Sequence, residues 1–421
     1  MAPPPQLPEE LVEEILVRFP PDEPASLVRA ALVCKLWRRI VSSAAFRGAF
    51  REFHRAAAPA LGMFCQFEED SDSGDDEAPP RSTARFVPMS FFRPSRAVRR
   101  CCRVLDARHG RVLLQNVPPW PPTLPTTTID LFVWDPISDE HRDLPGLPWP
   151  DSDPFPCDWK VAVLCRCCRD HHHHLDCASS SFLVVLVELR KQAMSTFIYS
   201  SESGAWAEVV ASSTTYHDDL KDKSCIGLWE PGVLVANVLH FNVSQLVDDD
   251  SDDALSVVTA LRYHLSMQRI STIRLRLPRL ARSDAHALVA TEGGKLGLAA
   301  IDKAKLCLYW PTTRDDDDNA QQLELGSGSG SRSNRELFVL GRVIHLEEVQ
   351  KTVVHPPDQP CFDLIDFNFA DSTQVLFIRT YDGALYSVHM KSGHVKKLPG
   401  CYNFCDLVVP YVSLHTPRMY T

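Results

Sequence analysis

The densest group of chemically capable side chains lies between Cys165 and Cys177, in the run CRCCRDHHHHLDC. Thiolate and imidazole are the ligands that zinc prefers, and four of them could come from so short a stretch. The spacing departs from the paired C-x₂₋₄-C of structural zinc sites. Because the run lies between two strand patterns, we interpret it as a composition-biased hairpin loop. An adventitious metal site is the alternative, and a catalytic site is the least favoured reading. We therefore predict no metal and no cofactor.

The sequence contains other residues of the types used in catalysis, but no pattern places them beside the partners that catalysis needs. His240, His264 and His345 are each flanked by strand-forming residues, and no acid is placed to complete a triad. The sequence has no P-loop, no G-x-S-x-G and no H-E-x-x-H. The run GSGSGSRS at 326–333 lacks the lysine of a phosphate-binding loop and is interpreted as a flexible insertion. We predict no catalytic residue.

The first fifty residues show helical periodicity. Leu11, Ile15 and Phe19 recur on one helix face, and Pro20-Pro21 ends that helix. A second pattern runs from 25 to 41 and a third from 46 to 53, which predicts a module of about three helices. So small a module buries little apolar surface on its own. It either packs on the rest of the chain or offers an apolar face to a partner.

The order of these residues resembles an F-box. The resemblance covers LPEELVEEILVRFPPDEPASLVRAALVCKLWRRIVSS and extends from about Leu7 to Phe53. It implies docking on the Skp-type adaptor of a cullin ubiquitin ligase. The residues that it assigns to docking, or to its immediate support, are Leu7, Pro8, Ile15, Leu16, Leu27, Val33 and Trp37. Leu11, Leu32 and Ile40 remain open between core and contact.

The composition changes between 54 and 97, which we interpret as a linker. APALGMFCQF could form one strand, whereas EEDSDSGDDEAPPRSTARF is acidic and carries almost no large apolar residue. Such a segment cannot bury enough surface to order itself, so we expect a flexible loop. Ser71 and Ser73 lie among acids, where phosphorylation is an alternative to a plain linker.

From 98 to 412 the pattern is that of short strands separated by turns, with VLVANVLHF taken as one of them. Many short strands indicate a sandwich, barrel or propeller. A repeat of about 40–60 residues, seen in about five copies, favours the propeller. Trp134-Asp135-Pro136 and Leu144-Pro145 are similar to an element of plant F-box-associated β domains. The fold class is thus α+β multidomain: an all-α F-box at 7–53, the linker, then a β-propeller-like domain.

The composition of the chain narrows the classes of protein to which it could belong. The chain has 421 residues, 44% hydrophobic and 23% charged, with a net charge of -10. That charge disfavours nucleic acid as a partner. The mean hydropathy of -0.15 and the absence of a long uncharged apolar run argue against a membrane span. No secretory signal is evident in MAPPPQLPEELVEE, so the 14 cysteines are expected as reduced thiols in the cytosol or nucleus.

Together these observations predict a non-catalytic substrate-recognition subunit of a Skp–cullin–F-box ubiquitin ligase. Its F-box would bind the adaptor and, through it, the cullin. Its β domain would bind a target protein through loops such as 152–157, 169–181 and 311–326. The alternative is a β-propeller enzyme, or a metal- or ligand-binding scaffold, that works outside a ubiquitin ligase.

Overall fold

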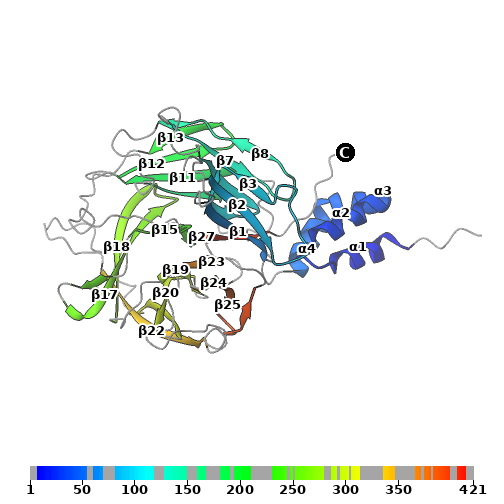
Figure 1. Ribbon diagram of the computed structural model, residues 1–421. Helices are drawn as coiled ribbons and strands as arrows, with labels where there is room; N and C mark the ends of the chain where they lie inside the picture. Colours follow the sequence, from blue (N-terminus) through cyan, green and yellow to red (C-terminus); the bar gives the residue numbers. More distant parts are fainter. Residues whose placement is uncertain are drawn as a thin grey trace, which may run out of the picture. The chain divides into compact units, whose positions relative to one another are not determined.

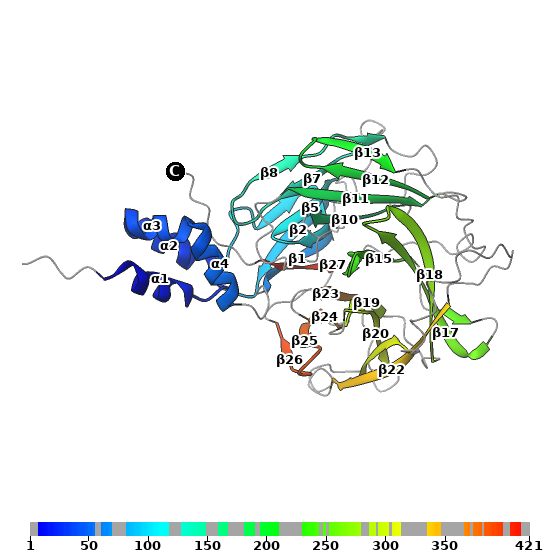
Figure 2. The ribbon, with the colours of Figure 1, turned by 180° about the vertical axis from the view of Figure 1, so that it is seen from behind.

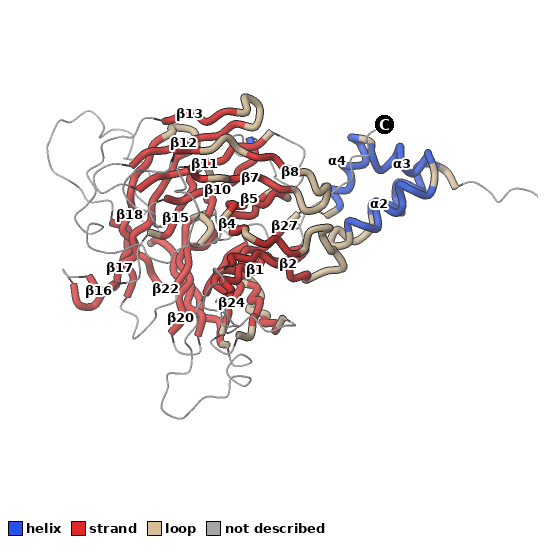
Figure 3. The backbone as a smooth tube through the Cα atoms, turned by 45° about the horizontal axis from the view of Figure 1, so that its top comes forward, coloured by secondary structure: helices blue, strands red, loops and turns tan. Residues whose placement is uncertain are grey.

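The computed structural model describes most of the chain as helices followed by strands (Figure 1; Figure 3). The residues described are 7–54, 60–69, 81–117, 128–148, 159–166, 181–189, 194–209, 230–243, 247–249, 252–278, 286–291, 294–302, 305–312, 335–346, 366–370, 374–380, 383–398 and 405–413. The chain divides into two compact units. The first comprises residues 1–187, 196–209 and 400–421, and the second comprises 188–195 and 210–399.

Four helices open the first unit, one more than the sequence predicted: α1 (Glu9–Val17), α2 (Pro24–Val33), α3 (Lys35–Ser42) and α4 (Ala44–Phe53). The single helix expected from 25 to 41 is wrong, because Cys34 has extended backbone (φ -158°, ψ 167°) and separates α2 from α3. Its Sγ accepts a hydrogen bond from the Trp37 amide at 3.5 Å. Ser43 Oγ accepts from the Phe46 amide at 3.0 Å and caps α4 in the same way.

The helices share a small apolar core. Its buried members are Val12, Leu16, Val17, Leu27, Ala30, Ala31, Ile40, Val41, Phe46 and Phe50. Two polar contacts also join α1 to the later helices. Arg39 pairs with Glu9 at 2.6 Å, and the His54 Nε2 lies 2.9 Å from the Val17 carbonyl oxygen.

Three four-stranded sheets make up the described β part of the first unit. In spatial order, the first sheet is β27 (Cys405–Val412), β1 (Ala60–Glu69), β2 (Arg81–Pro88) and β3 (Val98–Arg100). The second is β4 (Cys102–Arg108), β5 (Arg111–Asn116), β7 (Leu131–Trp134) and β8 (His141–Asp143). The third is β10 (Trp159–Cys165), β11 (Phe182–Leu189), β12 (Met194–Ser200) and β13 (Ala205–Val209). Beside them β6 (Thr128–Ile129) pairs with β9 (Leu147–Pro148).

The first sheet changes the expected boundary at residue 98. Both β1 and β2 lie inside the segment 54–97, which the sequence assigned to a linker. They pair antiparallel from Gly62↔Pro88 to Glu69↔Arg81. One strand was anticipated near 60, but RSTARF was placed in the acidic loop. Ser71 and Ser73 lie outside the described residues.

The second unit carries three more four-stranded runs among its described residues (Figure 2). The first run is β14 (Val233–Val235), β15 (Val238–Asn242), β17 (Asp252–His264) and β18 (Arg269–Pro278), with β16 (Val247–Asp249) paired to β17. The second is β19 (His286–Ala290), β20 (Leu296–Asp302), β21 (Lys305–Pro311) and β22 (Arg335–His345). The third is β23 (Asp366–Ala370), β24 (Val375–Arg379), β25 (Leu385–His389) and β26 (Val395–Lys397). A parallel pairing of β18 with β22 joins the first two runs into one nine-stranded sheet.

VLVANVLHF is a hairpin, which corrects the single strand expected from the sequence. β14 and β15 pair from Val233↔His240 to Val235↔Val238. Ala236 takes φ +50° in the turn between them. Alanine is uncommon in this left-handed region. Glycine or asparagine at this position would have indicated a turn, and alanine does not.

Successive sheets are arranged as blades within each unit. The first strands β27, β4 and β10 adjoin in one unit, and β14, β19 and β23 adjoin in the other. Apolar side chains fill the seams between neighbouring sheets: one core joins the second and third sheets, and two others join the successive runs of the second unit. Four-stranded sheets packed face to face in this way are the blades of β-propellers. The fold is therefore an N-terminal helical module followed by an all-β, propeller-like domain.

Candidate functional site

Helix α1 carries apolar residues on two faces, one buried and one exposed. Val12 and Leu16 are buried in the helical core. Leu7, just before α1, together with Leu11 and Ile15, is exposed to 53%, 46% and 45%. Of these three, Leu11 and Ile15 share one face of the helix because they are four residues apart, and Leu7 lies in the segment that leads into it. We call all three the α1 strip. Exposed aliphatic side chains that lie next to one another can be buried against a protein partner.

The junction of α2 and α3 exposes a second apolar pair. Leu32 is 71% exposed and Val33 is 65% exposed. They lie at the C-terminal end of α2, immediately before the extended residue Cys34. Because Cys34 stops α2 and starts α3, it fixes where these two side chains are presented. Trp37, one turn into α3, is half-buried.

The predicted docking residues fall into two groups. Leu7, Pro8, Ile15 and Val33 are exposed and Trp37 is half-buried, whereas Leu16 and Leu27 are 0% and 1% exposed and belong to the core. The buried pair can support a docking surface but cannot touch a partner. Leu11 and Leu32, left open by the sequence, are exposed, whereas Ile40 is buried. The signal for Leu11 was its place midway between Leu7 and Ile15.

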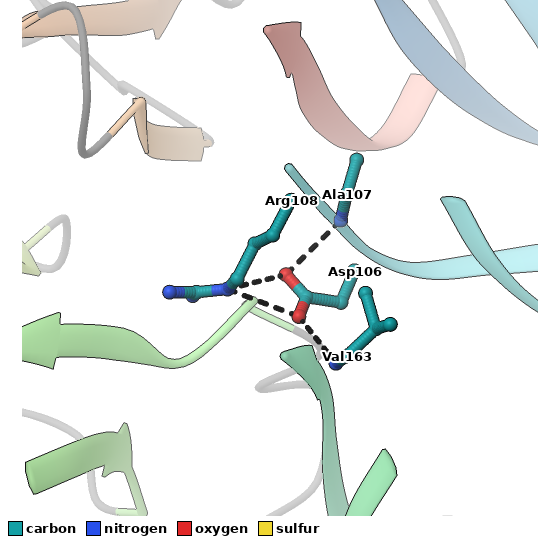
Figure 4. Close-up of polar contacts among 4 residues, drawn as sticks. All are labelled: Asp106, Ala107, Arg108 and Val163. Atoms are coloured by element: carbon teal, nitrogen blue, oxygen red, sulfur yellow. Dashed lines mark hydrogen bonds and ion pairs between the residues drawn. The ribbon is translucent and has the colours of Figure 1, made fainter. Parts of the chain in front are cut away.

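The most enclosed charged group of the described β part is Asp106, on β4 (Figure 4). Its carboxylate accepts hydrogen bonds from the Ala107 amide at 3.0 Å, from Arg108 Nε at 3.0 and 3.1 Å, and from the Val163 amide of β10 at 2.9 Å. Burial raises the pKa of the Asp106 carboxyl, and the Arg108 guanidinium and these hydrogen bonds oppose that rise. The Asp106 carboxylate thus accepts hydrogen bonds from two adjoining sheets and links β4 to β10.

Trp134-Asp135-Pro136 also has a structural role. Trp134 is fully buried, and its Nε1 donates to Asp139 Oδ1 at 3.0 Å across the turn. The Arg99 guanidinium lies 3.8 Å from the centroid of the Trp134 ring. Asp135 Oδ1 accepts from the Ile137 amide at 2.8 Å. The motif therefore builds the turn between β7 and β8, in agreement with the core-aromatic interpretation of Trp134.

The Cys- and His-rich run lies almost wholly outside the described residues, which include only Cys165 and Arg166 of it. Cys165 is buried in β10. Among the residues that the structure describes, no group of three His, Cys, Asp or Glu could hold a metal ion. The seven cysteines within the described ranges are free thiols. The loops 152–157 and 169–180 are not described either, nor is most of 311–326.

Comparison with known proteins agrees with this architecture at its N-terminus. Residues 4–47 match the family model of the F-box domain, so the helical module is an F-box. No match was found among curated proteins.

Several solved structures resemble this chain over most of its length, but with low sequence identity and low TM-scores. The WD40 domain of SCAP from fission yeast is 11% identical over 70% of this chain, with a TM-score of 0.32, and this chain spans 52% of that one. A chain of a nidogen–laminin complex is 6% identical over 84% of this chain and 99% of its own, with a TM-score of 0.34. The tricorn protease is 9% identical over 85% of this chain and 35% of its own, also with a TM-score of 0.34. At these scores the likeness carries no argument, and the propeller-like fold rests on the sheets described above.

Within the described part of the chain, none of the helices is both long enough and apolar enough to cross a membrane.

Proposed function

We propose that this chain is the substrate-recognition subunit of a Skp–cullin–F-box ubiquitin ligase. The F-box match at 4–47 carries the proposal, because that module implies binding to a Skp-type adaptor. The adaptor would connect the chain to the cullin. The propeller-like domain would hold a target protein so that its lysines meet the ubiquitin-charged enzyme at high effective concentration. In this mechanism the chain itself supplies no catalytic group.

The α1 strip is the part of the F-box that we assign to adaptor contact, together with Leu32 and Val33. Covering an aliphatic side chain that is half exposed removes apolar surface from water, at about 25 cal/mol per Å². The helical core already holds the buried face of α1, so binding needs no rearrangement of Val12 or Leu16. Pro8 and Trp37 are assigned to the rim of this surface, and Leu16 and Leu27 to its support.

The test is co-purification of the full chain with a purified Skp-type adaptor. The key variant combines Leu7→Ala, Leu11→Ala and Ile15→Ala. At about 1 kcal/mol for each truncated contact, its affinity should fall about a hundredfold. Because these side chains are already half exposed, the circular dichroism melting curve should stay close to that of the wild type.

Two controls separate contact from folding. Met267→Ala truncates a side chain of similar exposure, 59%, in the second unit and should bind normally. Leu16→Ala removes a fully buried side chain and should destabilise the F-box by about 2–5 kcal/mol. A well-folded wild type that fails to bind the adaptor would overturn the proposal and favour a scaffold or enzyme outside a ubiquitin ligase.

Three finer points belong to the same proposal. The similarity of Trp134-Asp135-Pro136 and Leu144-Pro145 to plant F-box-associated domains supports assigning the β domain to that type. A ligase subunit of this kind would work in the cytosol or the nucleus. The target protein would bind through loops between blades.

A further inference from the structure

A cavity of about 330 Å³ lies in the second unit, beside the seam between the run β19–β22 and the run β23–β26. Its volume is at the lower end of the range of small-molecule sites, about 300–1,000 Å³. The residues that line it are Val289, Thr291, Lys295, Leu308, Tyr309, Trp310, Pro311, Arg342, Gln374 and Met390. The F-box match has no bearing on this cavity, and the proposed ligase role does not depend on it.

Apolar side chains make up its floor. Val289, Leu308 and Met390 are buried members of the core that joins the two runs. Trp310 packs against the same core and is only partly buried. The floor therefore offers an apolar body of limited size a place to exclude water.

Trp310 lines one side of the cavity, and a β-bulge in the neighbouring strand leaves room for its ring. The pairing of β21 with β22 shifts between Leu308↔Arg342 and Tyr309↔Leu340, so Gly341 is the extra residue. A Cβ on Gly341 would lie 1.7 Å from the indole ring of Trp310. Only glycine leaves room for that ring against the backbone. Bulges of this kind re-aim side chains at functional sites.

Two cations flank the apolar floor. Lys295 is exposed and Arg342 is half-buried, and neither has an ion-pair partner among the described residues. The Thr291 hydroxyl donates to the Lys295 carbonyl at 2.9 Å and accepts from the Lys295 amide at 3.1 Å, which fixes the backbone at Lys295. Among the described residues that line the cavity, none is an aspartate or glutamate. The charged side chains among these described lining residues are thus both positive.

We propose that this cavity binds an apolar carboxylate: a compact aromatic or aliphatic body on the floor, with its carboxylate held by Arg342 and Lys295. The guanidinium of Arg342 can hold a carboxylate with two parallel hydrogen bonds, and Lys295 adds a second charge-assisted one. A cationic ligand would be repelled, and a wholly polar one would leave the apolar floor uncovered. A free small acid and the C-terminal carboxylate of a peptide share this chemistry.

The test uses ligand-observed NMR on the full chain with 3-phenylpropionate as the probe. The neutral 3-phenylpropanamide and the cationic 3-phenylpropylamine are matched probes of the same body. We expect saturation transfer to the acid, with a dissociation constant of about 1 mM or tighter for a ligand of this size. The amide should bind about tenfold more weakly, and the amine should not bind. N-acetyl-Gly-Phe, which ends in a carboxylate, distinguishes a peptide source from a free acid.

Matched variants locate the binding. Arg342→Gln should weaken the acid about tenfold while leaving the amide unchanged, and Lys295→Gln should weaken it less because that side chain is more exposed. Lys396→Gln and Arg269→Gln remove exposed cations that do not line the cavity and should have no effect. Gly341→Ala, which evicts the Trp310 ring, should weaken acid and amide alike.

Two results would overturn the proposal. One is no binding of either carboxylate to well-folded wild type at millimolar concentration. The other is equal binding of acid and amide, with no response to Arg342→Gln.

Discussion

His240, on β15, is a buried histidine whose ionisation opposes folding. It is 6% exposed. Burial lowers its pKa from 6.5 to about 4, and the nearby positive charge of Arg262 adds to that shift. His264 is shifted in the same direction for the same two main reasons, although it is more exposed. The strand pair β15–β17 thus keeps the imidazole of His240 buried and neutral beside the positive charge of Arg262.

A pH dependence follows from His240. The unfolded chain takes up this proton near pH 6.5 and the folded one only near pH 4, so the unfolded state binds more protons between these values. The stabilisation is complete above pH 6.5 and is lost as the pH falls toward 4, to a total of about 3 kcal/mol. Thermal melting at pH 7 and pH 4.5 should show a smaller loss for His240→Gln than for wild type. Equal losses in both proteins would contradict this assignment.

Residue by residue, helical periodicity identified the apolar positions of the F-box but not their two roles. Ile15 and Leu16 are adjacent and chemically alike, yet one is 45% exposed and the other fully buried. A helix that is apolar on both its buried face and its exposed face gives no sequence signal to separate them. Only the packing of α3 and α4 against α1 makes the distinction.

Among the elements, the join between α2 and α3 depends on one side chain. Cys34 Sγ caps α3 at 3.5 Å from the Trp37 amide, although thiols are weak acceptors. Cys34→Ser should keep or raise the stability of the F-box, because serine is a preferred N-cap residue, whereas Cys34→Ala should lower it by about 1 kcal/mol. Hydrogen exchange of the α3 amides measures both. Stronger protection in the alanine variant than in the serine variant would contradict the capping role.

Helices and strands were easier to predict than the breaks between them. Alternating and fully buried runs such as Trp159–Cys165 and Phe182–Leu189 have strong β-forming composition. Two breaks were missed, at Cys34, a residue type with little capping preference, and at Ala236-Asn237, where only the asparagine favours a turn. At Cys34 and at Ala236 the structure holds a backbone conformation that these two residue types do not favour by themselves.

At the scale of the molecule, the first sheet joins distant parts of the chain. β27 pairs antiparallel with β1, from Ala60↔Val412 to Phe67↔Cys405. The Tyr411 hydroxyl also donates to the Gly110 carbonyl at 3.1 Å, so β27 is tied to the second sheet as well. The pairing of β1 with β2 is local, but no pattern within 54–97 could predict the pairing with β27, because that strand lies near residue 410.

Removing β27 should therefore damage a region far away in sequence. Deletion of residues 405–421 leaves one edge of β1 unpaired, and hydrogen exchange of the β1 and β2 amides should rise by orders of magnitude. Deletion of 414–421 removes no described strand and serves as the control. Unchanged protection of β1 in the longer deletion would show that the sheet does not need β27.

The same pairing sets an order of events during synthesis. β1 leaves the ribosome early, but the strand that completes its sheet is translated last among the described elements. At about 5–20 residues per second, the wait lasts tens of seconds. Throughout that time an apolar strand with an open hydrogen-bonding edge is available to chaperones, or to a neighbouring nascent chain on the same messenger. A premature stop would make this exposure permanent, so shortened products would be marked for quality control by the edge of β1.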